Sequence, residues 1–293
     1  MTIVPPVFDG HNDVLTSKDH GSIADGRSGG HLDLPRMRAG GVRGGIFAVF
    51  TRSDGGAREV QVPRDDGVLE FEPAPRVEHT VAAADASAVA GRLLALERGG
   101  AVRVARSVDD LDRAQAGDGP PVAVLHLEGV EAIDPGLEAL DLWYGAGLRS
   151  IGPVWSRANA FAHGVPFISP SSPDTGPGLT DAGRALVRRC AELGILIDVS
   201  HLNEAGFWDL AGLDVGPVVA SHSGVHKLCP TSRNLLDSQL DAIGASGGVV
   251  GIVFAVPFLR ADFSDDPDTP ISLIAEHARY VADRIGVAHV ALG

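Results

Sequence analysis

Residues 7–15 read "VFDGHNDVL", and this stretch decides which fold to expect. A short apolar run reaches a glycine, and His11 and Asp13 then follow with one residue between them. Side chains alternate along a strand, so His11 and Asp13 lie on one face while Asn12 points the other way. The stretch therefore predicts a strand that ends in two potential metal ligands.

Similar apolar runs recur along the chain, with helix-like stretches between most of them. Strands that alternate with helices predict parallel βαβ units, and eight strands in this order predict an α/β fold of the (β/α)8 (TIM) barrel type. We expect one catalytic domain over residues 1–293, since no linker or internal repeat interrupts the pattern. The strand-like runs are residues 2–10, 43–50, 121–129, 148–156, 194–200, 216–223, 247–254 and 287–293.

The clearest helix signals flank residues 180–193, where Thr180 is a potential N-cap and Gly194 lies just past the end. Two turn-rich segments, residues 51–76 and 164–179, are expected to be loops laid over the scaffold. Helices are expected at residues 78–99, 133–146, 180–193, 203–212, 233–245 and 270–286.

The composition excludes several classes of protein. A net charge of −14 argues against a nucleic-acid binder, which needs a basic surface. The two cysteines, Cys190 and Cys229, imply no disulfide framework and favour a reducing compartment. The first residues lack the basic and apolar regions of a signal peptide, and no run reaches the roughly 20 apolar residues of a membrane span. We therefore expect a cytoplasmic protein without a membrane partner.

Other strand-like runs also end in residues that bind metals. Glu128 closes "VAVLHLE", His201 follows "ILIDVS", and His222 lies near the end of "VVASHS". In a (β/α)8 enzyme the C-terminal ends of the strands form the active-site face. Each motif alone is weak, because a strand-terminal Asp often caps a turn and a single His is commonly structural. The convergence of four strand ends is what predicts a metal site.

Three imidazoles and two carboxylates exceed the ligand set of a single catalytic zinc. They suit two zinc ions per chain, with one carboxylate bridging the ions and a bridging hydroxide as the nucleophile. Glu131 competes with Glu128 as the carboxylate ligand, but Glu128 lies at the end of the strand rather than beyond it. His126 lies one layer deeper on the face of Glu128 and is expected to support the ligands. Arg233 is either a solvated arginine near a helix start or a group that holds a substrate carboxylate.

Four motifs together resemble the membrane (renal-type) dipeptidases and their bacterial zinc-dipeptidase relatives. The motifs are "DGHNDVL", "LHLEGVEAI", "ELGILIDVSHLNE" and "ASHSGVHKLCPTSRN", and the similarity runs in order from about residue 6 to the last residue. The resemblance implies a (β/α)8 barrel of the metal-dependent hydrolase type that cleaves dipeptides, with tolerance for a D-residue on the C-terminal side. It also suggests a homodimer.

The resemblance implies a role for each matching residue. His11 and Asp13 would bind one zinc, His201 and His222 the other, and Glu128 would bridge both. Arg233 matches the family arginine that holds the C-terminal carboxylate of the substrate.

The chain departs from the family pattern after the fourth strand. The family usually has a histidine there that stabilises the developing oxyanion, and "SIGPVWSRAN" places Trp155 in that position. His163 in the following loop is a candidate to replace it, and Trp155 is a candidate wall of the substrate pocket.

A second departure concerns the last strand. The chain stops at "VAHVALG", whereas the family continues into an aspartate-containing segment of the D-F-D-G type, which acts on the protons of the bridging water and the leaving amine. The resemblance thus implies a barrel truncated near the eighth strand, with the C-terminal part of the family domain missing and no certain catalytic acid–base residue. We expect the 293-residue chain, if complete, to be a poor or inactive dipeptidase.

Two other functions compete with zinc-dependent dipeptide hydrolysis. Another metal-dependent amidohydrolase, such as a deaminase or a lactonase, could use the same barrel, although such enzymes commonly open with H-x-H and are often bridged by a carboxylated lysine. A barrel that binds metal without catalysis is the second alternative. It is favoured by Trp155 and by the missing segment.

Overall fold

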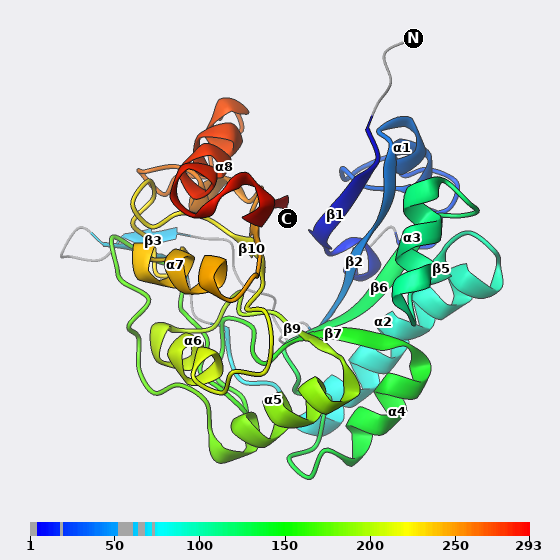
Figure 1. Ribbon diagram of the computed structural model, residues 1–293, viewed down its shortest axis with the longest axis horizontal. Helices are drawn as coiled ribbons and strands as arrows, with labels where there is room; N and C mark the ends of the chain where they lie inside the picture. The colour runs from blue at the N-terminus through cyan, green and yellow to red at the C-terminus, as the bar shows by residue number, and fades with distance from the viewer. Residues whose placement is uncertain (1–4, 18–19, 52–60, 64–67, 72–73) are drawn as a thin grey trace.

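The fold is organised by a curled parallel sheet (Figure 1). A computed structural model describes residues 5–17, 20–51, 61–63, 68–71 and 74–293. The strands of the main sheet are parallel throughout, and β5 pairs with β6 beside the main path. In sheet order these strands are β1 (Val7–Asn12), β2 (Val42–Phe50), β6 (Val122–Glu128), β7 (Leu148–Gly152) and β9 (Leu196–Ile197), with β5 at Arg103–Val104.

The apolar sequence of the central strands explains their position. Six consecutive residues of β2 are buried, as expected of a parallel strand that is covered on both faces. The pairing of β2 with β6 runs without a shift from Gly44–Val122 to Phe50–Glu128. Glu128 is therefore held at the C-terminal edge of the sheet by a regular register.

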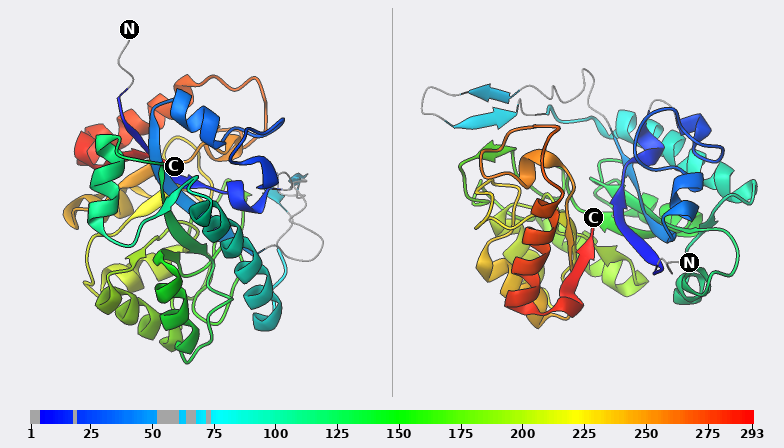
Figure 2. Two further views of the ribbon diagram at one scale, coloured as in Figure 1. Left: turned by 90° about the vertical axis from the view of Figure 1, so that its right-hand side faces the viewer. Right: turned by 90° about the horizontal axis from the view of Figure 1, so that it is seen from above.

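A second parallel sheet contains β10 (Ala220–Ser223), β11 (Val250–Ile252) and β12 (Val290–Leu292). A parallel bridge between Asp198 and Val219 links the end of β9 to the start of this sheet. At the other side β12 contacts β1, so these two strands lie side by side (Figure 2). The strand order along the chain thus brings β1 next to the second sheet.

Glycines make this approach possible. A Cβ atom on Gly251 would lie 1.8 Å from the carbonyl oxygen of Ser221, and one on Gly293 would lie 2.0 Å from it. A Cβ on Gly10 would lie 2.2 Å from the carbonyl oxygen of Leu292. A side chain at Gly251 or Gly293 would push β10 away from its neighbours, and one at Gly10 would push β12 away from β1. The glycines therefore permit the close packing of these strands.

Helices lie outside the curled sheet (Figure 1). The predicted caps of α5 are confirmed, because Thr180 accepts a hydrogen bond from the amide of Gly183 and Gly194 ends the helix at φ +68°. The α-helices are α1 (Leu34–Ala39), α2 (His79–Arg98), α3 (Val108–Ala116), α4 (Glu138–Ala146), α5 (Asp181–Leu193), α6 (Glu204–Ala211), α7 (Asp237–Ala245) and α8 (Ser272–Ile285). Short 3-10 helices are η1 (Val14–Thr16), η2 (His20–Ser22), η3 (Val256–Phe258) and η4 (Val287–His289).

Two segments expected to be loops contain strands, so this part of the prediction is wrong. An antiparallel sheet joins β3 (Gln61–Pro63), β4 (Leu69–Phe71) and β8 (Ile168–Ser169). These strands are only two or three residues long, too short for an alternating pattern to stand out in turn-rich sequence. Positions 52–60, 64–67 and 72–73 of the expected loop lie outside the described residues.

Two helices were not expected from the sequence. The helix α1 is only six residues long and has Pro35 in its first turn, and the nine residues of α3 follow a capping box between Ser107 and Asp110. Among the described residues, no helix combines the length and apolar character that crossing a membrane requires.

Candidate metal centre

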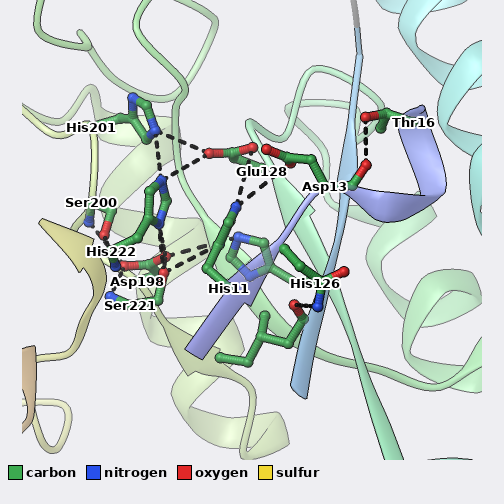
Figure 3. Close-up of polar contacts among 12 residues, drawn as sticks. His11, Asp13, Thr16, His126, Glu128, Asp198, Ser200, His201, Ser221 and His222 are labelled. Atoms are coloured by element: carbon green, nitrogen blue, oxygen red, sulfur yellow. Dashed lines mark hydrogen bonds and ion pairs between the residues drawn. The ribbon is translucent and has the colours of Figure 1, made fainter. Parts of the chain in front are cut away.

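The predicted ligands meet at one edge of the sheets (Figure 3). His11 lies near the end of β1, Glu128 ends β6, and His222 lies in β10. His201 follows β9 and has a φ of +70°, a left-handed backbone conformation that is uncommon outside glycine. Asp13 lies just beyond β1, and its side chain is 60% exposed. These residues (His11, Asp13, Glu128, His201 and His222) are the ligand cluster.

Glu128 occupies the middle of the ligand cluster. Its Oε1 lies 3.0 Å from Nε2 of His201 and 3.3 Å from Nε2 of His222. Its Oε2 lies 3.6 Å from Nε2 of His11, which in turn lies 3.7 Å from Oδ1 of Asp13. One carboxylate oxygen thus faces His201 and His222, and the other faces His11.

The imidazoles crowd around this carboxylate. The rings of His11 and His222 stack with their centroids 3.7 Å apart, and Nε2 of His201 lies 2.9 Å from Nε2 of His222. Nε2 of His11 is buried and has no hydrogen-bond partner among the described residues. Buried ring nitrogens that face each other and a carboxylate need either a hydrogen or a metal ion between them.

Burial and Glu128 set the charges of these groups. Burial lowers the pKa of His201 to about 4, and burial together with the nearby His11 lowers that of His222 well below its usual value. Burial opposes charge on His11 as well, but the Glu128 carboxylate raises the pKa of His11 well above its usual value. Although burial also disfavours the Glu128 carboxylate, His11 holds the pKa of Glu128 well below the ordinary range.

The donor set fits zinc. His11, Glu128 and His222 offer ligand atoms within 4.8 Å of one another, and neutral imidazole with carboxylate is a common zinc environment. The orphaned Nε2 of His11 gives an independent reason to expect a cation here. A further triad of His11, His126 and Asp198 meets the same distance criterion.

Hydroxyl groups contact the far side of the imidazoles. Oγ of Ser156 lies 2.7 Å from Nδ1 of His201, and Oγ of Ser221 lies 2.8 Å from Nδ1 of His222. Asp198, which is 1% exposed, accepts a hydrogen bond from the Ser221 hydroxyl. The sequence analysis missed Asp198, although a charged residue inside the apolar run "ILIDVS" is the signal that could have found it.

The two alternative residues at β6 lie behind or beside the ligand cluster. Nδ1 of His126 lies 2.7 Å from Oγ of Ser150, and its Nε2 lies 3.9 Å from Oδ2 of Asp198. Glu131 is engaged elsewhere, because its Oε1 accepts a hydrogen bond of 2.8 Å from Nε of Arg157. Glu131 also lies beyond the end of β6, whereas Glu128 is the last residue of that strand. Both observations favour Glu128 as the central carboxylate.

Arg233 is buried, so the alternative of a solvated arginine is wrong. Its Nη1 donates to Oγ of Ser223 at 2.8 Å, and its Nη2 donates to the carbonyl oxygen of His222 at 2.7 Å. Its Nε is buried, and no residue in the described part of the chain forms a hydrogen bond with it. The guanidinium is thus fixed to the strand that carries His222, with an unused N–H.

Trp155 and His163 occupy different surroundings. The ring of Trp155 lies 5.8 Å from that of His201 and packs against Phe50 at 4.8 Å and Phe167 at 5.6 Å. Nδ1 of His163 lies 3.4 Å from the carbonyl oxygen of Gly178. The tryptophan therefore borders the ligand cluster, whereas this contact of His163 gives no support for an oxyanion role.

The comparison with protein families agrees with this geometry. A family model described as membrane dipeptidase, peptidase family M19, matches residues 3–293. The chain belongs to this family. Membership in the M19 family implies a metal-dependent dipeptidase, and the chain contains a matching His/Glu/Asp cluster.

Solved M19 structures share the fold. A metallopeptidase from Rhodobacter sphaeroides, solved with a phosphinate mimic of the dipeptide L-Ala-D-Ala, is 41% identical to this chain, with a TM-score of 0.92. The match covers 99% of this chain and 86% of the Rhodobacter chain. A structure described as dipeptidase AC is 42% identical to this chain, with a TM-score of 0.91. The match covers 99% of this chain and 84% of the dipeptidase AC chain. The curled parallel sheet is therefore the M19 architecture.

A curated relative from Acinetobacter calcoaceticus is 39% identical over 289 residues, which are 96% of this chain and 90% of the relative. It is described as an uncharacterized protein in the PQQ-III 3′ region, so it extends the family match without adding an activity.

Proposed function

We propose that this M19 protein hydrolyses dipeptides with two zinc ions. His11 and Asp13 would hold one ion, and His201 and His222 the other. Glu128 would bridge the two ions. The observation that carries this assignment is the division of the Glu128 carboxylate, whose Oε2 faces His11 while its Oε1 faces His201 and His222.

The residues of the cluster suit this role. When bound, the two ions would polarise the scissile carbonyl and lower the pKa of a water enough to supply hydroxide at neutral pH. The low pKa values of His201 and His222 leave these imidazoles neutral and able to bind metal. Burial of the Glu128 carboxylate strengthens its attraction for cations, since little water screens it.

Arg233 would bind the C-terminal carboxylate of the dipeptide. Its guanidinium supplies a positive charge, and two hydrogen bonds already fix it beside His222. Tolerance for a D-residue at that position is supported by the relative from Rhodobacter sphaeroides, which was solved with a mimic of L-Ala-D-Ala. Trp155, next to His201, would border the bound dipeptide.

The same reasoning extends to the fold. We propose that residues 1–293 form a single catalytic (β/α)8 domain. The strands of the two parallel sheets follow one another in chain order, the Asp198–Val219 bridge links the sheets, and β1 contacts β12.

Binding of the phosphinate mimic of L-Ala-D-Ala tests the substrate side of this proposal. Calorimetry on the zinc-loaded 293-residue chain should give saturable binding that a chelator abolishes, together with zinc-dependent release of alanine from L-Ala-D-Ala, however slow. Zinc bound without any affinity for the mimic would instead indicate a metal-binding protein that is not a dipeptidase. Turnover of lactone or nucleobase substrates alone would indicate a different amidohydrolase.

A further inference from the structure

One hydroxyl group touches ligands of both proposed metal positions. Oγ of Ser221 lies 2.8 Å from Nδ1 of His222 and 3.3 Å from Nδ1 of His11, and it also contacts Oδ2 of Asp198 (Figure 3). His222 is assigned to one ion and His11 to the other. Ser221 therefore lies where it can influence both ions without contacting either.

The surroundings of Asp198 determine which way the Ser221 hydroxyl donates. Oδ1 of Asp198 accepts hydrogen bonds of 2.9 Å from the amides of both Ser200 and Ser221. Its Oδ2 faces the Ser221 hydroxyl. Three donors around a buried carboxyl group match an ionised carboxylate, which only accepts. The single hydrogen of the Ser221 hydroxyl must therefore point to Asp198.

This hydrogen count fixes the two imidazoles. A hydroxyl oxygen that has donated its hydrogen still has two lone pairs, and two ring nitrogens face them. Both nitrogens must donate, so His11 and His222 each carry a hydrogen on Nδ1. The Nε2 atom of each ring is then the one available for metal, and Nε2 is the atom that faces Glu128 in both cases.

We infer that Ser221, held by Asp198, is a positioning residue that prepares one histidine ligand for each of the two metal ions. The inference rests on the proposed binuclear function. It adds that the two metal positions share a single orienting hydroxyl, so loss of that group weakens both together.

The packing of β10 makes this arrangement rigid. The Ser221 carbonyl lies against Gly251 and Gly293 so closely that a Cβ at either position would meet it within 2.0 Å. The Asp198 carboxylate that holds the hydroxyl is buried at the link between the two sheets. Neither Ser221 nor Asp198 can therefore move away from the other unless neighbouring strands separate.

A cation held by His11, His126 and Asp198 is a competing explanation for the same groups. It is disfavoured because both oxygens of Asp198 already accept hydrogen bonds from protein donors.

Ser156 provides a matched comparison. Its hydroxyl lies 2.7 Å from Nδ1 of His201, with no other ring nitrogen among its hydrogen bonds to described residues. Loss of this hydroxyl should therefore affect only the ion at His201 and His222. The variants Ser156→Ala and Ser221→Ala each remove a hydroxyl group that contacts histidine ligands. Ser156→Ala should weaken one metal position, whereas Ser221→Ala should weaken both.

Zinc titration against a chelator of known affinity measures both steps of binding. We expect Ser221→Ala to weaken both steps by about 10–100-fold, and Ser156→Ala to weaken one step by a similar factor. Equal effects of the two variants on a single step would overturn the inference, as would an unchanged zinc affinity in a folded Ser221→Ala protein. If the unaltered protein bound no zinc at all, the proposed function would fail instead.

A measurement on the unaltered protein avoids any loss of folding in the variants. In zinc-loaded protein labelled with 15N-histidine, NMR should show His11 and His222 with a protonated Nδ1 and a metal-bound Nε2. Metal on Nδ1 of either ring, or an unprotonated Nδ1, would overturn the inference while leaving the zinc count intact.

Discussion

Nε2 of His201 lies 2.9 Å from Nε2 of His222, and only one hydrogen fits between them. Ser221 requires His222 to carry its hydrogen on Nδ1, whereas the Ser156 hydroxyl can either donate to Nδ1 of His201 or accept from it. In the zinc-free protein the shared hydrogen therefore belongs to His201. Zinc binding must then move or remove that hydrogen, so His201 has to change its protonation on Nε2, whereas His222 keeps its hydrogen on Nδ1.

Glu128→Gln should weaken both zinc positions. A carboxamide keeps the size of Glu128 but removes the negative charge and turns one acceptor into a donor toward the imidazoles. We expect each zinc affinity to fall more than about 100-fold, because loss of a direct ligand exceeds the effect of an outer partner. Zinc titration measures this, with Glu138→Gln on the exposed start of α4 as the control. A Glu128→Gln protein that keeps both ions would contradict the central role of Glu128.

Zinc affinity should fall as the pH is lowered through neutrality. In the metal-free fold, Glu128 raises the pKa of His11 well above its usual value, so the ring is a doubly protonated imidazolium at pH 7. This ring must lose one proton when zinc binds. The pKa values of His201, at about 4, and of His222 are lowered, so these rings are already neutral. Histidine 15N shifts of the zinc-free protein check this directly. A neutral His11 ring at pH 7 would show that the prediction is wrong.

Arg233→Met should remove recognition of the C-terminal carboxylate. A hydrogen bond to a charged group contributes about 1.5–3 kcal/mol, so the Kd of the phosphinate dipeptide mimic should rise by about 10–150-fold. The matched ligand is the same mimic with its carboxylate converted to an amide, which should bind the variant and the unaltered protein alike. Equal losses for acid and amide would mean that Arg233 acts only through its contacts with His222 and Ser223.

Trp155→Ala should reduce the affinity for dipeptides with large apolar side chains more than for L-Ala-D-Ala. The tryptophan ring borders His201 and packs with Phe50 and Phe167, so its loss removes apolar contact area on that side. We expect about a tenfold loss for the larger ligands, consistent with one aromatic contact, and a smaller loss in Trp155→Phe. Competition binding with a series of dipeptide mimics measures this. Identical losses across the series would exclude a role in substrate selection.

Gly251→Ala should destabilise the fold strongly. Its Cβ would lie 1.8 Å from the Ser221 carbonyl oxygen, so β10 and β11 would have to separate. We expect the free energy of unfolding in urea to fall by about 3 kcal/mol or more. Gly91→Ala in α2 is the control, since no other described part of the chain lies within 4 Å of its Cβ position and alanine favours a helix by up to about 1 kcal/mol. Equal stability of the two variants would mean that the strands can adjust.

The local patterns of the sequence were sufficient to predict strands at β1, β2, β6, β7, β9, β10, β11 and β12, but not the short strands β3, β4, β5 and β8. The alternation that puts His11 and Asp13 on one face depends only on neighbouring residues, and the caps Thr180 and Gly194 are equally local. Glu128 was predictable because it ends a continuous apolar strand.

Contacts between distant segments were not predictable in the same way. Asp198 and Ser221 are 23 positions apart, and their hydrogen bonds depend on the register between the end of β9 and β10. The ion pair between Glu131 and Arg157 and the burial of Arg233 likewise depend on tertiary packing. The sequence therefore predicted residues that meet around Glu128, and it missed Asp198 and Ser221, whose contacts depend on the tertiary fold.

The zinc content of the purified 293-residue chain tests the central claim most directly. After loading with excess zinc and removal of the unbound metal, inductively coupled plasma mass spectrometry should give about two zinc ions per chain, as a binuclear hydrolase requires. The same measurement on Glu128→Gln should give far less than two. A single ion per chain, or the same content in both proteins, would contradict a binuclear centre bridged by Glu128.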